Sequence, residues 1–431
     1  MSAFSSTCCG ANKPPERRRT RGRRWFRTRD SAGVAAALAA RSACGDAPAG
    51  ADNGNMVQIT CRCWVEVSCR QLAENFHAVR AAVGAGVEVM PVVKADAYRH
   101  GAVEVSRILT QEGARWLAVS NVEEGVTLRQ AGITARILVM GDFLPFERPA
   151  LIDYELTPCI HSIAQLLDYD RMGAALARPL PYHLALDTGM SRLGTREEPS
   201  TLARAIAACH ASRFEGLMTH FASAGNYASA QTDEQLACFH AIRDTLAGAG
   251  LTPRYQHLSS TIPVAYGRRQ AWGNMVRPGH AIYGYLSPAR GDAPPPLLRV
   301  RPALDWKARI LEVKDLPPGA RVGYGAMFTA ERPTRIAVLA VGYADGMMHR
   351  LSNKGKVIAG GRLVPILGAI SMDLTCIDIT DCAHLSPGDV VTLLGSDGNV
   401  TLDAQTIARA AGAISYSVLC GIGQRVKRIY V

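Results

Sequence analysis

Apolar residues follow two alternating patterns from residue 57 to about residue 290. Short runs rich in β-branched and aliphatic residues predict buried strands, among them 87–93, 116–119, 137–140, 182–186, 216–218 and 255–258. Between these runs apolar residues recur at helical spacing, for instance across 234–246. Asn121, with Glu124 three residues later, predicts a helix start. This alternation indicates a parallel sheet, and the number of repeats favours a closed (β/α)8 barrel over an open sheet.

The pattern changes after about residue 290. Residues 292–296 form a proline-rich connector, and the short alternating runs beyond it are separated by turn signals, which is typical of an all-β domain. One weak helix is predicted over 404–411. The chain is therefore divided into three parts, which are a disordered Arg-rich extension over 1–56, a barrel over 57–292 and a C-terminal β domain over 293–431.

The net charge of +11 invites a nucleic-acid interpretation, so its position in the sequence matters. Residues 1–55 hold ten basic residues against four acidic ones, which leaves +5 for the rest of the 431-residue chain. The basic character belongs mainly to this extension, and no nucleic-acid partner is expected for the remainder. The extension resembles a transit peptide, but Met56 opens a much more regular sequence, and a start at Met56 is the favoured interpretation.

No apolar run approaches the length of a membrane span, and no charged segment precedes a long apolar core, so no membrane anchor or secretory signal is expected. The twelve cysteines are mostly scattered singly, which is typical of free thiols in a reducing cytoplasm. No Cys-x-x-Cys pair has a matching His or Cys pair, so no metal site is predicted.

Lys94 follows the apolar run 87–93, so it lies at the carboxyl end of a predicted buried strand. In barrels and parallel sheets this edge carries the chemistry. An ammonium group surrounded by apolar side chains loses hydration, its pKa falls, and the amine becomes able to form a Schiff base. The alternative is a lysine that extends from a strand end into solvent, and for an isolated lysine this alternative is the more common one.

Other strand ends carry polar side chains as well. Arg192 lies in a loop after the strand 182–186, where a planar guanidinium could bind a carboxylate or a phenolate, or simply form a surface ion pair. His220 and His257 end two successive strands, although a single histidine is more often structural than catalytic. Arg277 precedes Gly279, whose backbone could approach an anion, and a helix start after it would add a favourable dipole.

In the β domain, Tyr324 and Tyr343 each lie within a glycine-flanked turn. Taken alone, each is more commonly an ordinary turn tyrosine than a functional one.

Together these segments resemble the bacterial alanine racemases. The resemblance covers about residues 64–430, and it is specific because the motifs occur in the same order and spacing. The motifs are Pro91–Gly101, Asp187–Gly194, Thr219–Phe221, Asn274–Gly284, the turn at Tyr324, Gly342–Gly346 and Ser371–Asp373. The family consists of homodimers that use pyridoxal 5′-phosphate and have a barrel and a β domain, which is the organisation predicted above.

The resemblance implies a role for each matching residue. Lys94 would hold the cofactor and act as one base, and Tyr324 would act as the opposite base from the partner subunit. Racemisation requires a proton to leave one face of a planar carbon and another to arrive at the other face, so two bases fit the chemistry. Arg277 would face the pyridine nitrogen. The resemblance further implies phosphate binding by Tyr98, Thr261 and the backbone of Gly279 and His280, and substrate binding by Arg192 and, from the partner subunit, by Met372. His220 and His257 would belong to the chain of residues that links Tyr324 to Arg277 and holds its charge state. Tyr343 and Asp373 would line the entry channel.

Three positions depart from the family pattern. Many members have a carbamylated lysine at the position of Ala185, where it orients the arginine that corresponds to Arg192. Thr261 replaces a phosphate-binding serine and keeps a hydroxyl. Gln424 replaces a tyrosine that often contacts the phosphate, and it is taken here as a cofactor-binding residue. These departures affect the expected substrate range and leave the cofactor chemistry unchanged.

The sequence therefore predicts a cytoplasmic alanine racemase that supplies D-alanine for peptidoglycan and acts on a small amino acid. One rival is a serine or broad-specificity racemase on the same scaffold. A decarboxylase of the same architecture would release CO2 and would carry an acid instead of Arg277. A non-enzymatic cofactor carrier would not need the β domain with Tyr324, and DNA binding through the extension would be salt-sensitive.

Overall fold

The computed structural model describes residues 61–431. The predicted disordered extension and the start predicted at Met56 lie outside the described residues.

Eight parallel strands form a barrel. Six of them pair in the order β3-β4-β5-β6-β7-β8, and β2 pairs with β9. The backbone N–H of Val93 donates to the Ala118 carbonyl (2.9 Å) and that of Asn274 to the Gln256 carbonyl (3.1 Å), so hydrogen bonds close the ring on both sides of the β2–β9 pair. The predicted (β/α)8 barrel is confirmed. The strands are β2 Glu88–Val89, β3 Trp116–Val119, β4 Arg136–Val139, β5 Thr157–Ile160, β6 Leu180–Ala185, β7 Ser212–Met218, β8 Tyr255–His257 and β9 Met275–Val276.

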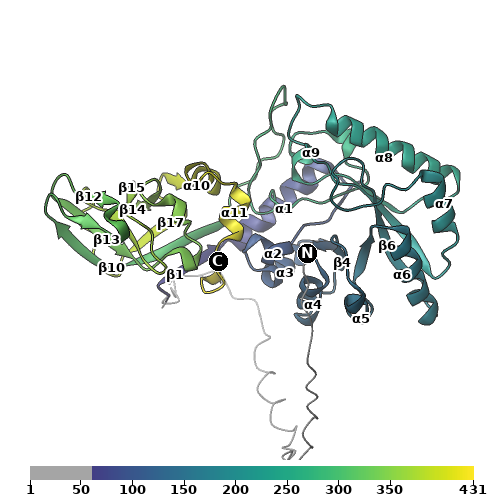
Figure 1. Cartoon of the computed structure of the whole chain (residues 1–431), viewed down its shortest axis with the longest axis horizontal. Helices are drawn as coiled ribbons and strands as arrows, with labels where there is room; N and C mark the ends of the chain where they lie inside the picture. The colour runs from purple at the N-terminus through teal and green to yellow at the C-terminus, as the bar shows by residue number, and fades with distance from the viewer. Residues whose placement is uncertain (1–60) are drawn as a thin grey trace, which may run out of the picture. The chain divides into compact units, whose positions relative to one another are not determined.

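Helices connect the strands, and Figure 1 shows α4 to α8 along the outside of the parallel strands. The predicted start at Asn121 is confirmed, because its side chain accepts a hydrogen bond from the Glu124 backbone N–H at 2.9 Å. The helices of this part are α1 Cys69–Val83, α3 Ala102–Gln111, α4 Val122–Gln130, α5 Arg148–Asp153, α6 Ile163–Ala175, α7 Pro199–Ala207, α8 Gln231–Gly248 and α9 Thr261–Ala265, with short 3-10 turns at Pro145–Glu147 and Arg269–Ala271.

The other described residues include a nine-stranded sheet in the order β18-β17-β14-β15-β16-β13-β10-β1-β19, with an additional β17–β10 pairing. Its strands are β1 Cys63–Val67, β10 Leu304–Leu316, β13 Thr334–Leu339, β14 Lys356–Ala359, β15 Arg362–Leu367, β16 Thr375–Asp378, β17 Val390–Asp397, β18 Val400–Leu402 and β19 Lys427–Tyr430. A separate hairpin consists of β11 Arg321–Val322 and β12 Phe328–Thr329. The 3-10 turns are Tyr324–Ala326, Tyr343–Asp345 and His349–Leu351. The predicted helix is α10 Ala404–Ala411, and a second helix, α11 Ser415–Cys420, was not predicted.

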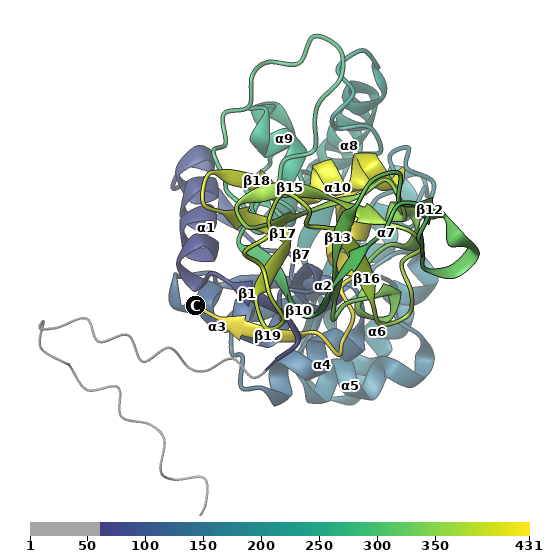
Figure 2. The same cartoon turned by 90° about the vertical axis from the view of Figure 1, so that its left-hand side faces the viewer.

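Strand β1 precedes the barrel in the sequence but belongs to the nine-stranded sheet. It runs antiparallel to β10 and parallel to β19, and Figure 2 shows the three strands side by side. The two ends of residues 61–431 thus lie in neighbouring strands of one sheet. The domain boundary predicted between residues 292 and 293 stays a prediction.

Lys94 opens α2 (Lys94–Tyr98), and this segment is not an ordinary helix. Residues 95–99 all have positive φ, from 53° at Ala95 to 66° at Arg99. For residues with a side chain, left-handed backbone costs roughly 1–2 kcal/mol each. Hydrogen bonds compensate for this strain, since the Glu124 carboxylate accepts from the Ala95 N–H (2.7 Å) and the Asp96 carboxylate accepts from the Ala102 N–H (2.8 Å).

The C-terminal strand holds the far end of this left-handed segment. Arg428 Nε donates to the Arg99 carbonyl (3.1 Å), and the Tyr430 hydroxyl donates to the His100 carbonyl (3.0 Å). Gly101 follows with φ +91°, and a Cβ there would overlap the Tyr430 hydroxyl oxygen. The strained segment that starts at Lys94 is therefore fixed from the β domain.

None of the helices within residues 61–431 combines the length and the apolar character that a membrane crossing requires.

We predict that Gly101→Ala destabilises the protein more than Gly84→Ala does. Both glycines have positive φ (+91° and +82°), so each substitution costs about 1–3 kcal/mol of backbone strain. A Cβ on Gly84 meets nothing within 4 Å, whereas one on Gly101 meets Tyr430. Urea unfolding should show an extra loss of at least about 1 kcal/mol for Gly101→Ala.

Adding Tyr430→Phe to Gly101→Ala removes the overlapping oxygen and should recover part of that extra loss. Equal losses for the two glycine variants would contradict the proposed close contact.

Candidate active site

A cavity of about 620 Å³ opens among the carboxyl ends of the barrel strands. Its lining includes the cationic side chains of Lys94, Arg192 and Arg277 and contains no Asp or Glu. A cavity with this charge favours anionic ligands. Eight of the residues predicted from the sequence line it, namely Lys94, Tyr98, Arg192, His220, Thr261, Arg277, Gly279 and His280.

The surroundings of Lys94 favour the neutral form of its amine. Burial lowers the pKa of Lys94, and the positive charge of Arg192 lowers it further, while Glu124 acts in the opposite direction. A larger fraction of this lysine is therefore in the neutral, nucleophilic form at neutral pH than for a lysine in water. The predicted strand-end position of Lys94 is confirmed, and the following left-handed segment also brings Tyr98 into the cavity.

Arg277 is 2% exposed and forms the floor of the site. Its Nη2 donates to the carbonyls of Thr219 (2.8 Å) and Leu258 (3.1 Å), and its Nη1 donates to the carbonyl of His257 at 2.6 Å. Burial lowers the pKa of Arg277 to about 10, so the guanidinium still carries its charge at neutral pH.

A chain of buried imidazoles extends from Arg277 into the barrel. Arg277 Nη1 lies 2.8 Å from His257 Nδ1, and His257 Nε2 lies 2.7 Å from His183 Nδ1. An arginine can only donate, so His257 Nδ1 accepts and its Nε2–H donates to His183. This leaves the proton of His183 on Nε2, which lies 3.9 Å from the carboxylate of Glu215. Glu215 is itself bound by both terminal nitrogens of Arg136.

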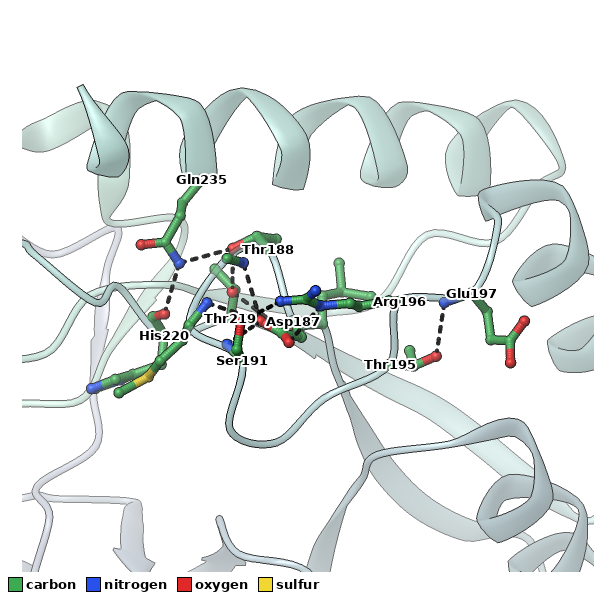
Figure 3. A network of polar contacts seen from close by, with 12 residues as sticks. Asp187, Thr188, Ser191, Thr195, Arg196, Glu197, Thr219, His220 and Gln235 are labelled. Atoms are coloured by element: carbon green, nitrogen blue, oxygen red, sulfur yellow. Dashed lines mark hydrogen bonds and ion pairs between the residues drawn. The ribbon is translucent and has the colours of Figure 1, made fainter.

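His220 contacts Arg277 from the end of β7, with Nδ1 3.3 Å from Arg277 Nη2. Burial, followed by the positive charges of Arg277, Arg192 and Lys94, lowers the pKa of His220 to about 3. The ring is therefore neutral at physiological pH. Figure 3 shows Gln235 reaching from α8 to the His220 carbonyl (3.1 Å) and to Thr188 (3.2 Å), which fixes the backbone at this strand end.

A glycine-rich turn follows β9. The Thr261 hydroxyl accepts from the N–H groups of Gly279 and Ala281, both at 3.2 Å. A Cβ on Gly279 would overlap the Tyr98 hydroxyl, so only glycine permits this close approach. No helix starts directly after Arg277, because residues 280–284 form turns, so no helix dipole is available there. Backbone N–H groups and hydroxyls are the available anion ligands.

The loop that carries Arg192 is held by Asp187. One carboxylate oxygen accepts from the N–H groups of Gly189 (3.1 Å), Met190 (2.9 Å) and Ser191 (2.9 Å), and the other accepts from Arg196 Nε at 2.7 Å. Figure 3 shows Arg196 and Ser191 converging on Asp187. Burial raises the pKa of Asp187, but these hydrogen bonds outweigh burial and the pKa is lowered overall. The loop is thus rigid, while Arg192 itself is exposed and projects into the cavity.

The remaining predicted residues do not line this cavity. Tyr324 is 77% exposed in the turn after β11, Tyr343 is 47% exposed and Met372 is 53% exposed. The Asp373 carboxylate accepts from Arg425 at 2.7 Å. Gln424 lines a neighbouring cavity beside Cys420 and Arg99. A single chain therefore leaves these predicted residues outside the pocket.

The structure also adds cavity residues that were not predicted, among them Ser120, His161, Met218, Tyr416 and Cys420. His161 directly follows β5, a strand that the sequence analysis did not predict. Tyr416 and Cys420 lie on α11, which the sequence pattern did not reveal. Within residues 61–431, no group of three His, Cys, Asp or Glu side chains is arranged to hold a metal ion.

Fold and cavity together define a (β/α)8 barrel protein with a cationic cavity at the carboxyl ends of its strands. The chain is similar to known proteins along most of its length. The family profile of the alanine racemase N-terminal domain matches residues 67–287, and that of the C-terminal domain matches residues 303–430. The chain belongs to the alanine racemase family.

Individual relatives support this assignment. An alanine racemase of Halothermothrix orenii is 37% identical over 374 residues, which cover 86% of this chain and 98% of the relative. The structure of alanine racemase from Clostridium difficile 630 has a TM-score of 0.80 and 32% identity, and the match covers 87% of this chain and 97% of that one. That from Bartonella henselae, with covalently bound pyridoxal phosphate, has a TM-score of 0.76 and 26% identity, with 86% and 100% covered.

We predict that His183 and His257 stay neutral, with the proton on Nε2, from pH 8 down to pH 5. Burial lowers the pKa of His183 to about 3 and that of His257 well below 6.5, so both rings take up protons only at more acidic pH. Proton–nitrogen NMR spectra of histidine-labelled protein measure the tautomer directly, and His183→Asn assigns the signals. A ring of this pair that titrates above pH 5, or that carries its proton on Nδ1, would contradict the donor order derived from Arg277.

Proposed function

We propose that this protein interconverts L-alanine and D-alanine with pyridoxal 5′-phosphate as its cofactor. The observation that carries the proposal is the Lys94 amine, with its lowered pKa, in a cavity that holds two further cations and no carboxylate. Such a cavity fits a ligand that combines an aldehyde with a dianionic phosphate. The family membership and the covalently bound cofactor of the Bartonella henselae relative support the same assignment.

The lining residues fit the cofactor chemically. In the proposal, Lys94 attaches it covalently, Thr261, Tyr98 and the backbone N–H groups around Gly279 and His280 hold the phosphate, and Arg277 faces the pyridine nitrogen. Gln424, which was predicted to bind the cofactor, lines the neighbouring cavity and receives no contact in this proposal. When bound, pyridoxal phosphate supplies an electron sink for the electron pair left at the substrate's α-carbon.

Two residues of the chain would move the protons. Lys94 acts as the base on one face of the α-carbon, and Tyr324 acts on the opposite face. Tyr324 is too exposed to serve the cavity of its own chain, which supports a homodimer in which each subunit gives its tyrosine to the partner's cavity. Tyr343, Met372 and Asp373 lie on the same β domain, and in the proposal they border the partner's cavity too.

Arg277 would control the reaction type. A guanidinium does not readily give up its proton, so it keeps the pyridine nitrogen unprotonated and limits electron withdrawal by the ring. His220 and His257 hold Arg277 in place through the hydrogen bonds described above. This arrangement favours return of the proton to the α-carbon over transamination or decarboxylation.

Arg192 and the partner's Met372 would bind the substrate carboxylate, with the guanidinium as the charged contact. Alanine is the proposed substrate, and the reaction would supply D-alanine for peptidoglycan in the cytoplasm. The second candidate is a serine or broad-specificity racemase, because Ala185 and Gln424 are smaller than the residues common in the family. Equal turnover of larger L-amino acids would favour that candidate.

We also propose that the boundary between the barrel part and the β-domain part of the chain falls between residues 292 and 293, with β1 from the N-terminal part completing the sheet of the β domain. The family profiles, which match 67–287 and 303–430, support this division.

Lys94→Ala should abolish covalent attachment of pyridoxal phosphate and reduce racemisation by at least about 10³-fold, because it removes both the anchor and one base. Mass spectrometry after borohydride reduction measures the attachment, and D-alanine formation measures the rate. Lys354→Ala, at an exposed surface lysine, is the matched control and should keep both. Full turnover by Lys94→Ala would refute the mechanism.

Tyr324→Phe should slow racemisation by about 10²–10⁴-fold and keep α-hydrogen exchange for one enantiomer only. Lys94 remains in this variant, so it can still exchange the hydrogen on its own face of the α-carbon. Proton NMR in deuterium oxide, started from each enantiomer separately, distinguishes the two rates. Equal loss of exchange from L- and D-alanine would argue against a base role for Tyr324.

A further inference from the structure

His161 lies directly after β5, on the wall of the cavity opposite the glycine-rich turn. In an eight-stranded barrel, β5 is four strands away from β9, which precedes Gly279. The register pairs Cys159 with His183 and Ile160 with Leu184, so His161 lies level with Ala185 at the end of the neighbouring strand. Residues at the same level of parallel strands point to the same side of the sheet, and both line the cavity.

The backbone of His161 is fixed by a hydrogen bond, and no other side chain holds its ring. The His161 N–H donates to the Gln165 side chain at 2.7 Å, and Gln165 also holds Asp142. His161 is only 9% exposed, and its ring makes no hydrogen bond to another side chain among the described residues; the backbone carbonyls of Met140 and Gly141 are the polar groups nearest to it. A buried polar group without a partner is costly, so this ring is expected to have a partner in the loaded site.

The other two histidines of the cavity are already engaged. His220 contacts Arg277, and His280 contacts the Ser415 hydroxyl at 3.4 Å. His161 is thus the cavity histidine whose ring makes no hydrogen bond to another side chain among residues 61–431. Ala185 beside it offers no side-chain acceptor.

The Arg192 guanidinium, in turn, has N–H donors that lack acceptors among the described residues. Its guanidinium carries five N–H donors, of which a substrate carboxylate can use two. No hydrogen bond or ion pair holds it to any of the described residues, and the cavity lining contains no carboxylate that could orient it. A hydrogen-bond acceptor on the side of the cavity formed by β5 and β6 would fix the orientation of the Arg192 guanidinium.

We propose that His161 is a positioning residue that accepts a hydrogen bond from Arg192 and orients the guanidinium toward the substrate carboxylate. The inference rests on the proposed function and adds a residue to the substrate-binding machinery. Burial lowers the pKa of His161, although Asp142 and the backbone carbonyls of Gly141 and Met140 oppose this shift. A neutral ring that donates its one N–H to such a carbonyl keeps a lone pair on the other nitrogen, as the role requires.

The test is to measure KM and kcat separately, because loss of a positioning residue for the substrate carboxylate should affect KM much more than kcat. His161→Leu should raise the KM for alanine about tenfold, because a hydrogen bond to a charged group is lost, and should change kcat by less than about threefold. The inhibition constant of propionate, a carboxylate without an amine, should rise in parallel. His161→Asn keeps an acceptor and should restore both values to within about threefold of the wild type.

Affinity for pyridoxal phosphate should stay unchanged in both variants, and His210→Leu, at an exposed histidine, is the matched control.

A double-variant cycle with Arg192→Lys tests whether His161 acts through Arg192. In the Arg192→Lys background, His161→Leu should cause little further increase in KM. Effects that multiply, or an unchanged KM and propionate constant in His161→Leu, would overturn the proposal. Absence of racemisation by the wild-type protein would refute the proposed function instead, so the two failures are distinguishable.

Discussion

The left-handed turn at residues 95–99 is the constraint on which the site depends. Five consecutive residues with side chains adopt positive φ, at a cost of several kcal/mol, and the gain is that Lys94 and Tyr98 both face one cavity. The segment has no glycine until Gly101, so its shape is imposed by its surroundings. Glu124 holds its start, and Arg428 and Tyr430 of the last strand hold its end. This clamp gives the β domain a structural role in the barrel's chemistry.

Charge is the second organising feature. The cavity gathers cations without any carboxylate, so the pKa of Lys94 falls and His220 stays neutral. The compensating anion lies deep in the barrel, where Glu215 is separated from Arg277 by two imidazoles. Such an arrangement leaves the cavity free to accept the negative charges of a phosphate and a carboxylate, while it keeps the arginine in its charged form.

Much of the fold and the strand-end residues could be predicted from the sequence, and specific physical reasons explain the rest. The barrel follows from the period of apolar runs, and Asn121 marks a helix start by its side chain. The left-handed turn was not predictable, since Ala95 and Ala97 carry no local signal for positive φ. Strand β1 has the same apolar pattern as a barrel strand, and only its long-range pairing with β10 and β19 assigns it to the other sheet. Tyr324 does not line the cavity of its own chain, and in the proposed dimer its position depends on a second chain, which no local pattern encodes.

The central claim is that each active site joins Lys94 of one subunit to Tyr324 of another. The most direct test is to mix Lys94→Ala and Tyr324→Phe chains after partial unfolding and to let them reassociate. A heterodimer would contain one site with both native residues and one site with neither, so random pairing should restore about a quarter of the wild-type activity from two nearly inactive proteins. Activity that stays at the level of the separate variants, in a mixture shown by mass to contain the heterodimer, would contradict the shared site.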